Sequence, residues 1–182
     1  MENSIEQLQY PIGKFTCPKE ITQNHISEWI ATLETLPKRL ESMVEHLSAE
    51  QLETPYRPEG WTVRQLIHHI ADSHHHSYTR FKWALTEDQP LIKAYEEKEW
   101  SSLFDARTAP IQLSLDYLKA LHAKIVYLLK GLSEDKLKIY YVHPEGNVNV
   151  TVAENIGKYA WHSNHHFAHI EGLLKREGWL KS

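Results

Sequence analysis

Histidine is over-represented in this chain of 182 residues, which contains 13 of them. Nine fall in two short stretches: His68, His69, His74, His75 and His76 in the first, and His162, His165, His166 and His169 in the second. Imidazole changes charge near neutral pH and is the commonest side-chain ligand for transition metals. The two stretches are therefore the first candidates for a metal site or for acid–base chemistry.

The second stretch contains two overlapping His-x-x-x-His pairs, His162 with His166 and His165 with His169. Side chains four residues apart share one face of a helix, so either pair could direct two ring nitrogens at one metal ion. At 100° per residue, the apolar residues of this segment centre near Ile170. His166 and His162 lie roughly 40° and 80° from that direction, and the other pair lies roughly 100° and 140° from it. We therefore expect His162 and His166 to face the interior.

Two imidazoles leave a metal ion short of ligands, so a third must come from a facing helix. His69 lies at the edge of the apolar arc of its segment, where a ring can reach a cavity and still bind a supporting partner. His74 points into that arc and is expected to be a hydrogen-bonded core residue, as is His122. Spacing alone leaves the third ligand open. A fourth ligand, for instance His76 or His165, would indicate a closed structural site, and a coincidence of surface histidines is the alternative to any site.

Several other chemistries find no support in the sequence. Carboxylate-bridged di-iron sites need repeated Glu-x-x-His motifs, and no Glu stands three residues before any His. No glycine-rich phosphate loop is present, and Cys17, the single cysteine, has no partner for a disulfide or a thiolate metal site. The formal net charge of −4 gives no basic surface for nucleic acid. The acidic amino terminus and the lack of a long apolar run predict a cytoplasmic protein that neither enters nor crosses a membrane.

Four long segments with apolar residues at spacings of three and four predict the helices that position the histidines. We expect these helices at about residues 27–47, 62–87, 111–131 and 152–177. Capping boxes mark the beginning of the second helix at Thr62 and of the fourth at Thr151. Pro37 predicts a kink or break near residues 33–36 of the first helix.

The connections complete the predicted architecture. The first 20 residues are expected to form an extended arm, and residues 88–110 a long crossover with one short helix at about 96–100. A small β-hairpin is expected from residues 138–142 and 148–152, just before the last helix. The sequence therefore predicts an all-α protein, a four-helix bundle forming one domain over residues 1–182.

Five motifs resemble those of the YfiT group of the DinB-like superfamily. They are YPIGKF at residues 10–15, TPYR at 54–57, GWTVRQ at 60–65, HHIADSH at 68–74, and the run from Trp161 to Ile170. The resemblance extends over almost the whole chain. It implies a four-helix bundle with a divalent ion, Zn²⁺ or alternatively Ni²⁺, bound by His69, His162 and His166. The resemblance thus names the third ligand that spacing left open.

The resemblance also implies a homodimer and a metal-dependent hydrolase, with relatives that transfer low-molecular-weight thiols such as bacillithiol. Three neutral imidazoles and an open position would let a divalent ion activate either water or a thiol. We expect a small-molecule substrate and a hydrolase, with a thiol S-transferase using an external thiol, or a non-catalytic metal-binding bundle, as alternatives. The catalytic base is not identified, because Asp72 and Glu154 are equally well explained as ligand-orienting or helix-capping residues.

Overall fold

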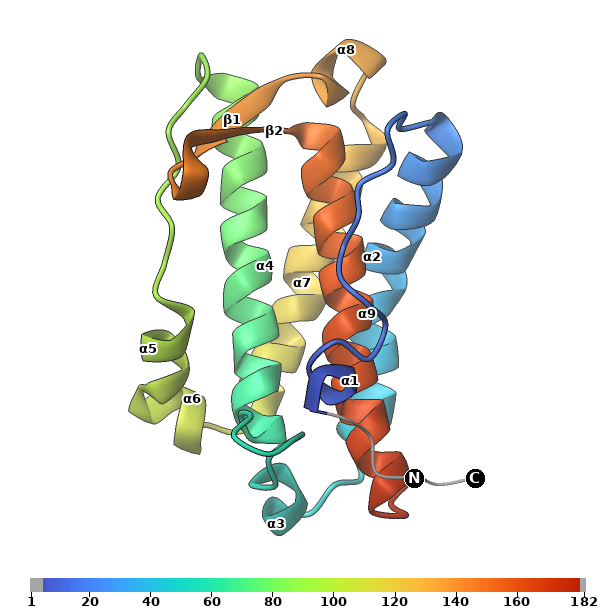
Figure 1. The fold of residues 1–182 in the computed structure, drawn as a ribbon, viewed down its shortest axis with the longest axis vertical. Helices are drawn as coiled ribbons and strands as arrows, with labels where there is room; N and C mark the ends of the chain where they lie inside the picture. Colours follow the sequence, from blue (N-terminus) through green and yellow to red (C-terminus); the bar gives the residue numbers. More distant parts are fainter. Residues whose placement is uncertain (1–4, 181–182) are drawn as a thin grey trace.

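Four long helices form a bundle in the computed structural model, which describes residues 5–180 (Figure 1). They are α2 (Gln23–Val44), α4 (Val63–Thr86), α7 (Ile111–Lys130) and α9 (Val152–Arg176). The predicted four-helix bundle is confirmed. No helix within residues 5–180 is both long and apolar enough to cross a membrane.

The helix ends follow their capping residues. Thr62 and Thr151 form the predicted capping boxes at the beginning of α4 and α9. α2 begins four residues earlier than predicted because Thr22 and His25 form a further capping box, which the apolar pattern does not reveal. It also ends earlier, at Val44 instead of residue 47.

The kink or break predicted near residues 33–36 does not interrupt α2, which is continuous from Gln23 to Val44 with Pro37 inside it. Proline has no N–H, so the carbonyl of Leu33, four residues earlier, loses its helical partner. That carbonyl accepts a hydrogen bond of 2.6 Å from Nδ1 of His122 on α7 instead. A side chain from the neighbouring helix thus replaces the backbone bond that Pro37 removes.

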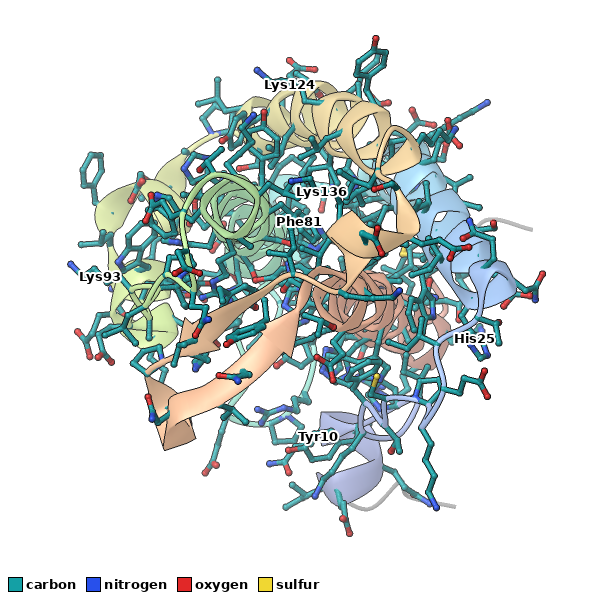
Figure 2. All side chains as sticks on the ribbon, turned by 90° about the horizontal axis from the view of Figure 1, so that it is seen from above. Tyr10, His25, Phe81, Lys93, Lys124 and Lys136 are labelled. Carbon is teal, nitrogen blue, oxygen red and sulfur yellow. The ribbon has the colours of Figure 1, made fainter. Side chains whose placement is uncertain are left out.

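The interior consists of two apolar layers with a polar layer between them. The layer near the amino-terminal end of α4 includes Leu36, Leu66 and Ile170, and the layer nearer the hairpin includes Phe81 and Ile156. Seen from above in Figure 2, Phe81 lies between the helices, whereas labelled polar residues such as Lys93 and Lys124 lie at the periphery. The histidines of α4, α7 and α9 that face one another occupy the level between the two apolar layers.

The connections contain short elements. α3 (Ala49–Leu52) joins α2 to α4, and α8 (Glu134–Leu137) follows α7. The crossover holds two short helices, α5 (Glu97–Ser102) and α6 (Phe104–Thr108), where one was predicted. The predicted hairpin is confirmed: β1 (Tyr140–His143) pairs antiparallel with β2 (Val148–Thr151) around the 3₁₀ turn η1 (Glu145–Asn147), with Tyr140 opposite Thr151.

The amino-terminal arm is not wholly extended, because it contains α1 (Ile5–Gln9). Isoleucine, glutamate, glutamine and leucine tolerate a helix, and Pro11 prevents it from continuing. The arm then runs along α9 (Figure 1), where Trp161 Nε1 donates a hydrogen bond of 3.2 Å to the carbonyl of Gly13. The arm therefore covers a side of α9 that the other three long helices leave uncovered.

Candidate metal centre

Three of the predicted site residues converge between α4 and α9. His69 comes from α4, and His162 and His166 come from successive turns of α9. One ring nitrogen from each lies within 4.8 Å of the other two. Within residues 5–180, no fourth histidine, cysteine or carboxylate adds an atom within that distance of all three. The cluster thus offers three nitrogens to one ion, fewer than the four ligands of a closed structural zinc site.

Burial keeps the three imidazoles neutral. It lowers the pKa of His69 to about 4, with a smaller contribution from His165, and lowers the pKa of His162 and His166 well below the usual value. The Trp61 ring packs on His69 with centroids 4.6 Å apart and shields it from solvent. Neutral imidazole is the form that binds a metal ion.

A chain of hydrogen bonds through the core assigns the tautomer of His162. The Leu33 carbonyl can only accept, so His122 Nδ1 carries the proton in their 2.6 Å hydrogen bond. His122 is neutral, its pKa lowered by burial to about 4, so its Nε2 accepts from His74 Nδ1 at 3.0 Å. His74 Nε2 then accepts from His162 Nδ1 at 3.2 Å. His162 is left with a lone pair on Nε2. This path is the inner chain, His162–His74–His122–Leu33.

A second chain assigns the tautomer of His166. His169 Nε2 donates to the carbonyl of Gln9 in the arm at 3.2 Å, so His169 Nδ1 is an acceptor. It faces His166 Nδ1 at 3.4 Å, which therefore carries the proton. His166 is also left with a lone pair on Nε2. We refer to His166–His169–Gln9 as the outer chain.

The two Nε2 atoms of His162 and His166 lie 3.0 Å apart. Because both Nδ1 atoms carry the protons, neither Nε2 has a hydrogen to donate, and two lone pairs at this distance repel each other. Two nitrogen ligands of a tetrahedral zinc ion lie about 3.3 Å apart. His69, whose ring makes no hydrogen bond within the described chain, contributes the third nitrogen. The donor set fits a divalent cation, and the other partner that the structure offers to one of these lone pairs is the Ser73 hydroxyl, at 3.5 Å from His162 Nε2.

A second histidine group shares His166 with the first. Ring nitrogens of His165, His166 and His169 also lie within 4.8 Å of one another. Here, however, His169 uses both nitrogens in the outer chain, so this group orients His166. The helical projection placed His165 and His169 away from the interior, yet only 8% and 4% of their surface is exposed, since the arm and Tyr56 cover them.

The other sequence candidates have structural partners. His74 and His122 are the hydrogen-bonded core residues that were predicted. Glu154 accepts from the backbone and hydroxyl of Thr151 and is a capping residue. Asp72, whose pKa is raised to about 6 by burial and then by Asp105, does not belong to either histidine group.

Ser73 is a site residue that the sequence reasoning missed. Its hydroxyl lies 3.5 Å from His162 Nε2, on the side of α4 that also carries His69. Serine is common in helices and carries no metal-ligand signature. The available signal was its position four residues after His69, which places both side chains on one helical face.

Comparisons with known proteins agree with the fold, and the names of the relatives mention metal dependence. A model of the DinB superfamily matches residues 32–170. A protein of Oceanobacillus iheyensis named "Putative metal-dependent hydrolase" is 48% identical over 171 residues, covering 94% of this chain and 98% of that protein. "Putative metal-dependent hydrolase YfiT" of Bacillus subtilis is 45% identical over 172 residues, covering 94% and 97%.

One solved structure superposes closely on the bundle. It has a TM-score of 0.93 and 44% identity, and the match covers 96% of this chain and 99% of the other. That structure is described as YfiT from Bacillus subtilis, "a probable metal-dependent hydrolase with an unusual four-helix bundle topology". The similarity therefore includes the complete arrangement of α2, α4, α7 and α9.

Proposed function

The chain belongs to the DinB superfamily, and on that basis we propose that it is a hydrolase that binds one divalent ion through His69, His162 and His166. The observation that carries the proposal is the pair of Nε2 atoms 3.0 Å apart, each with its ring proton committed elsewhere. The names of the relatives support metal dependence. Neutral nitrogen ligands and a three-coordinate protein set suit Zn²⁺, and Ni²⁺ is the alternative.

A divalent ion with three imidazole ligands and an open position supplies a nucleophile near neutral pH by lowering the pKa of bound water. The chain's own residues prepare that position. The inner and outer chains fix two ring orientations, and Trp61 packs over the third ring. The Ser73 hydroxyl, beside His162 Nε2, can donate to or accept from a group at the open position.

Metal analysis of tag-free protein tests the site. We expect one ion per chain for the wild type and for a His75→Ala control. His75 lies on α4, as His69 does, but it is exposed and belongs to neither histidine group. His166→Ala removes one of the two facing lone pairs and should weaken binding at least about 100-fold. Unchanged metal content in His166→Ala would overturn the three-histidine site.

Activity measurements test the reaction. The zinc- and nickel-loaded proteins would be incubated with chromogenic esters, amides and phosphate esters, and with a chlorinated aromatic electrophile, each with and without bacillithiol. A hydrolase should turn over at least one ester, amide or phosphate ester without thiol. Turnover that requires the thiol would support an S-transferase, and the sulfur would be external, because Cys17 lies in the arm and belongs to neither histidine group. Absence of all turnover would favour a non-catalytic metal-binding bundle.

The homodimer implied by the family resemblance stays a prediction. Sedimentation equilibrium of the metal-loaded protein would test it directly, and a monomer at micromolar concentration would contradict it.

A further inference from the structure

The face of α4 that presents His69 continues toward the hairpin and reaches a buried arginine. Arg80 follows His69 by 11 residues, which returns it to within about 20° of the same direction. Only 6% of its surface is exposed, and its Nε has no hydrogen-bond partner in the described chain. Its Nη1 makes a long hydrogen bond of 3.3 Å to the hydroxyl of Tyr159, and the hydroxyl of Tyr141 also lies within reach of the guanidinium. A buried guanidinium with so few partners is energetically unfavourable unless something else binds it.

No carboxylate neutralises Arg80 at close range. The salt bridges formed within residues 5–180 involve Arg64, Lys130, Lys138 and Lys175, and none involves Arg80. Glu97 on α5 is near, but burial raises the pKa of its carboxyl, and the charges of Lys158 and Arg80 lower it less. A carboxylate paired tightly with Arg80 would have a lowered pKa. Within residues 5–180, Arg80 therefore forms no close ion pair, although the carboxyl of Glu97 lies near enough to interact with its charge.

Two further polar atoms beside Arg80 are buried without partners. They are the hydroxyl of Tyr95, from the crossover, and Nε2 of His76, from α4. The two rings stack with centroids 4.2 Å apart, and Trp100 packs on both at 5.1 Å. Burial raises the pKa of Tyr95, so its hydroxyl keeps its proton and can donate. The crossover and α4 thus place a hydroxyl donor and an unpartnered imidazole nitrogen together, in a region that also contains the Ser73 hydroxyl and the carboxyls of Glu97 and Asp72.

The donor group adjoins the histidine cluster. Tyr159, which binds Arg80, has its ring 5.5 Å from the ring of His162. Arg80 lies seven residues beyond Ser73, about 10 Å along the helix. Helical side chains lean toward the amino terminus, which directs the guanidinium back toward Ser73 and the cluster. The two groups are close enough for one small molecule to reach both.

We propose that Arg80 and Tyr95 bind an anionic group of the substrate, a carboxylate or a phosphate, while the bond to be broken lies at the histidine cluster. The guanidinium can donate two parallel hydrogen bonds to such a group, and Tyr95 adds a third. The substrate is then a small anion whose charge lies within about 10 Å of its reacting bond. The link to the reacting bond rests on the proposed function, but the anion site itself does not require the metal ion.

Nuclear magnetic resonance of protein labelled with ¹⁵N-arginine tests the anion site. The Nε–H signal of Arg80 would be assigned from its loss in Arg80→Lys. Sodium phosphate and sodium acetate would each be added against sodium chloride at constant ionic strength. We expect a saturable shift of this signal with at least one of the two anions, and the stronger one identifies the preferred group. Tyr95→Phe keeps the ring stack and should weaken binding several-fold.

Arg39 provides an internal control. It already donates to Asn164 at 3.0 Å and packs over Phe167 at 4.2 Å, so its signal should not respond to either anion. Absence of a saturable Arg80 shift with both anions would overturn the proposal. An equal shift at Arg39 would also overturn it, because it would indicate a general ionic effect.

The same titration in His166→Ala separates this proposal from the proposed function. An Arg80 shift that persists when the metal site is removed supports an anion site independent of the ion. A shift that disappears with the metal would mean that the anion binds the ion and would overturn the role of Arg80. If His166→Ala retained its metal while Arg80 still responded, the proposed metal site would fail and the anion site would stand.

Discussion

The inner and outer chains reach the same chemical result by different structural means. Each ends on a backbone carbonyl that a helix cannot satisfy: Leu33 because Pro37 lacks an N–H, and Gln9 because it is the last residue of α1. The inner chain crosses the core through all four long helices, from α9 through α4 and α7 to α2. The outer chain ends in an arm on the surface of α9. Local interruptions of helical hydrogen bonding therefore set the protonation of His162 and His166, one through the bundle core and one through the amino-terminal arm.

Breaking the inner chain in its middle should have the largest effect. His122→Leu leaves the Leu33 carbonyl and His74 Nδ1 without partners in the core. We expect the free energy of unfolding to fall by about 2–4 kcal/mol and metal affinity to fall about 10- to 100-fold. Urea unfolding of the metal-free protein and chelator competition would measure the two effects. An unchanged affinity in a folded variant would contradict the role of the inner chain.

Acid should destabilise the folded protein through His122. Its pKa is about 4 in the folded protein and about 6.5 when unfolded. Above pH 6.5 neither state binds the proton, but as the pH falls toward 4 the unfolded state binds it first. Stability is therefore lost across this window, by up to about 3 kcal/mol for His122.

Urea unfolding of metal-free wild type and His122→Leu at pH 7.5, 6 and 5 would isolate this contribution. The stability difference between the two proteins should shrink as the pH falls. A difference that does not change with pH would show that His122 is not held neutral by burial.

Removing the arm should break the outer chain with a smaller effect. Deletion of residues 1–10 takes away the Gln9 carbonyl, but water can reach His169 and accept its proton. We expect metal affinity to fall about 10-fold, which is the smaller end of the range of losses seen when a residue that orients a metal ligand is removed. The midpoint of urea unfolding should change little. Chelator competition would measure the affinity, and a loss as large as that of His122→Leu would contradict the ranking of the two chains.

Pro37→Ala should have the smallest effect on affinity. It restores an N–H that competes with His122 for the Leu33 carbonyl, but a carbonyl can accept two hydrogen bonds. We expect an affinity about 3-fold weaker, together with a free energy of unfolding about 1 kcal/mol higher because the helix regains its bond. General damage to the fold would lower both the metal affinity and the free energy of unfolding, whereas this substitution should lower the first and raise the second. Stronger metal binding would contradict the account.

Periodicity and capping residues were sufficient to predict the four helices. They also placed His162 and His166 on the inward face, but His69 was one candidate among several until the resemblance selected it. The start of α2 at Thr22 and the course of the arm could not be predicted, because neither depends on an apolar repeat. Pro37 was interpreted only as the cause of a kink or break, since the hydrogen bond that the Leu33 carbonyl accepts in its place comes from His122, on a helix distant in sequence.

The burial of Arg80 was equally inaccessible to sequence reasoning. Its position on the polar stripe of α4 is typical of a solvent-exposed side chain. It is covered by α9 through Tyr159, and the crossover packs on the neighbouring His76 through Tyr95; both contacts join residues that are distant along the chain. Contacts of this kind follow from the packing of the bundle and not from a local pattern.

Long-range ¹H–¹⁵N correlation spectra of histidine-labelled protein, recorded at pH 7.5 before and after one equivalent of Zn²⁺, test the central claim most directly. The account predicts that His162 and His166 both carry their proton on Nδ1 in the metal-free protein, and that zinc shifts their Nε2 signals and that of one nitrogen of His69. A proton on Nε2 of either residue before zinc, or zinc-induced shifts at their Nδ1 atoms in place of Nε2, would contradict it.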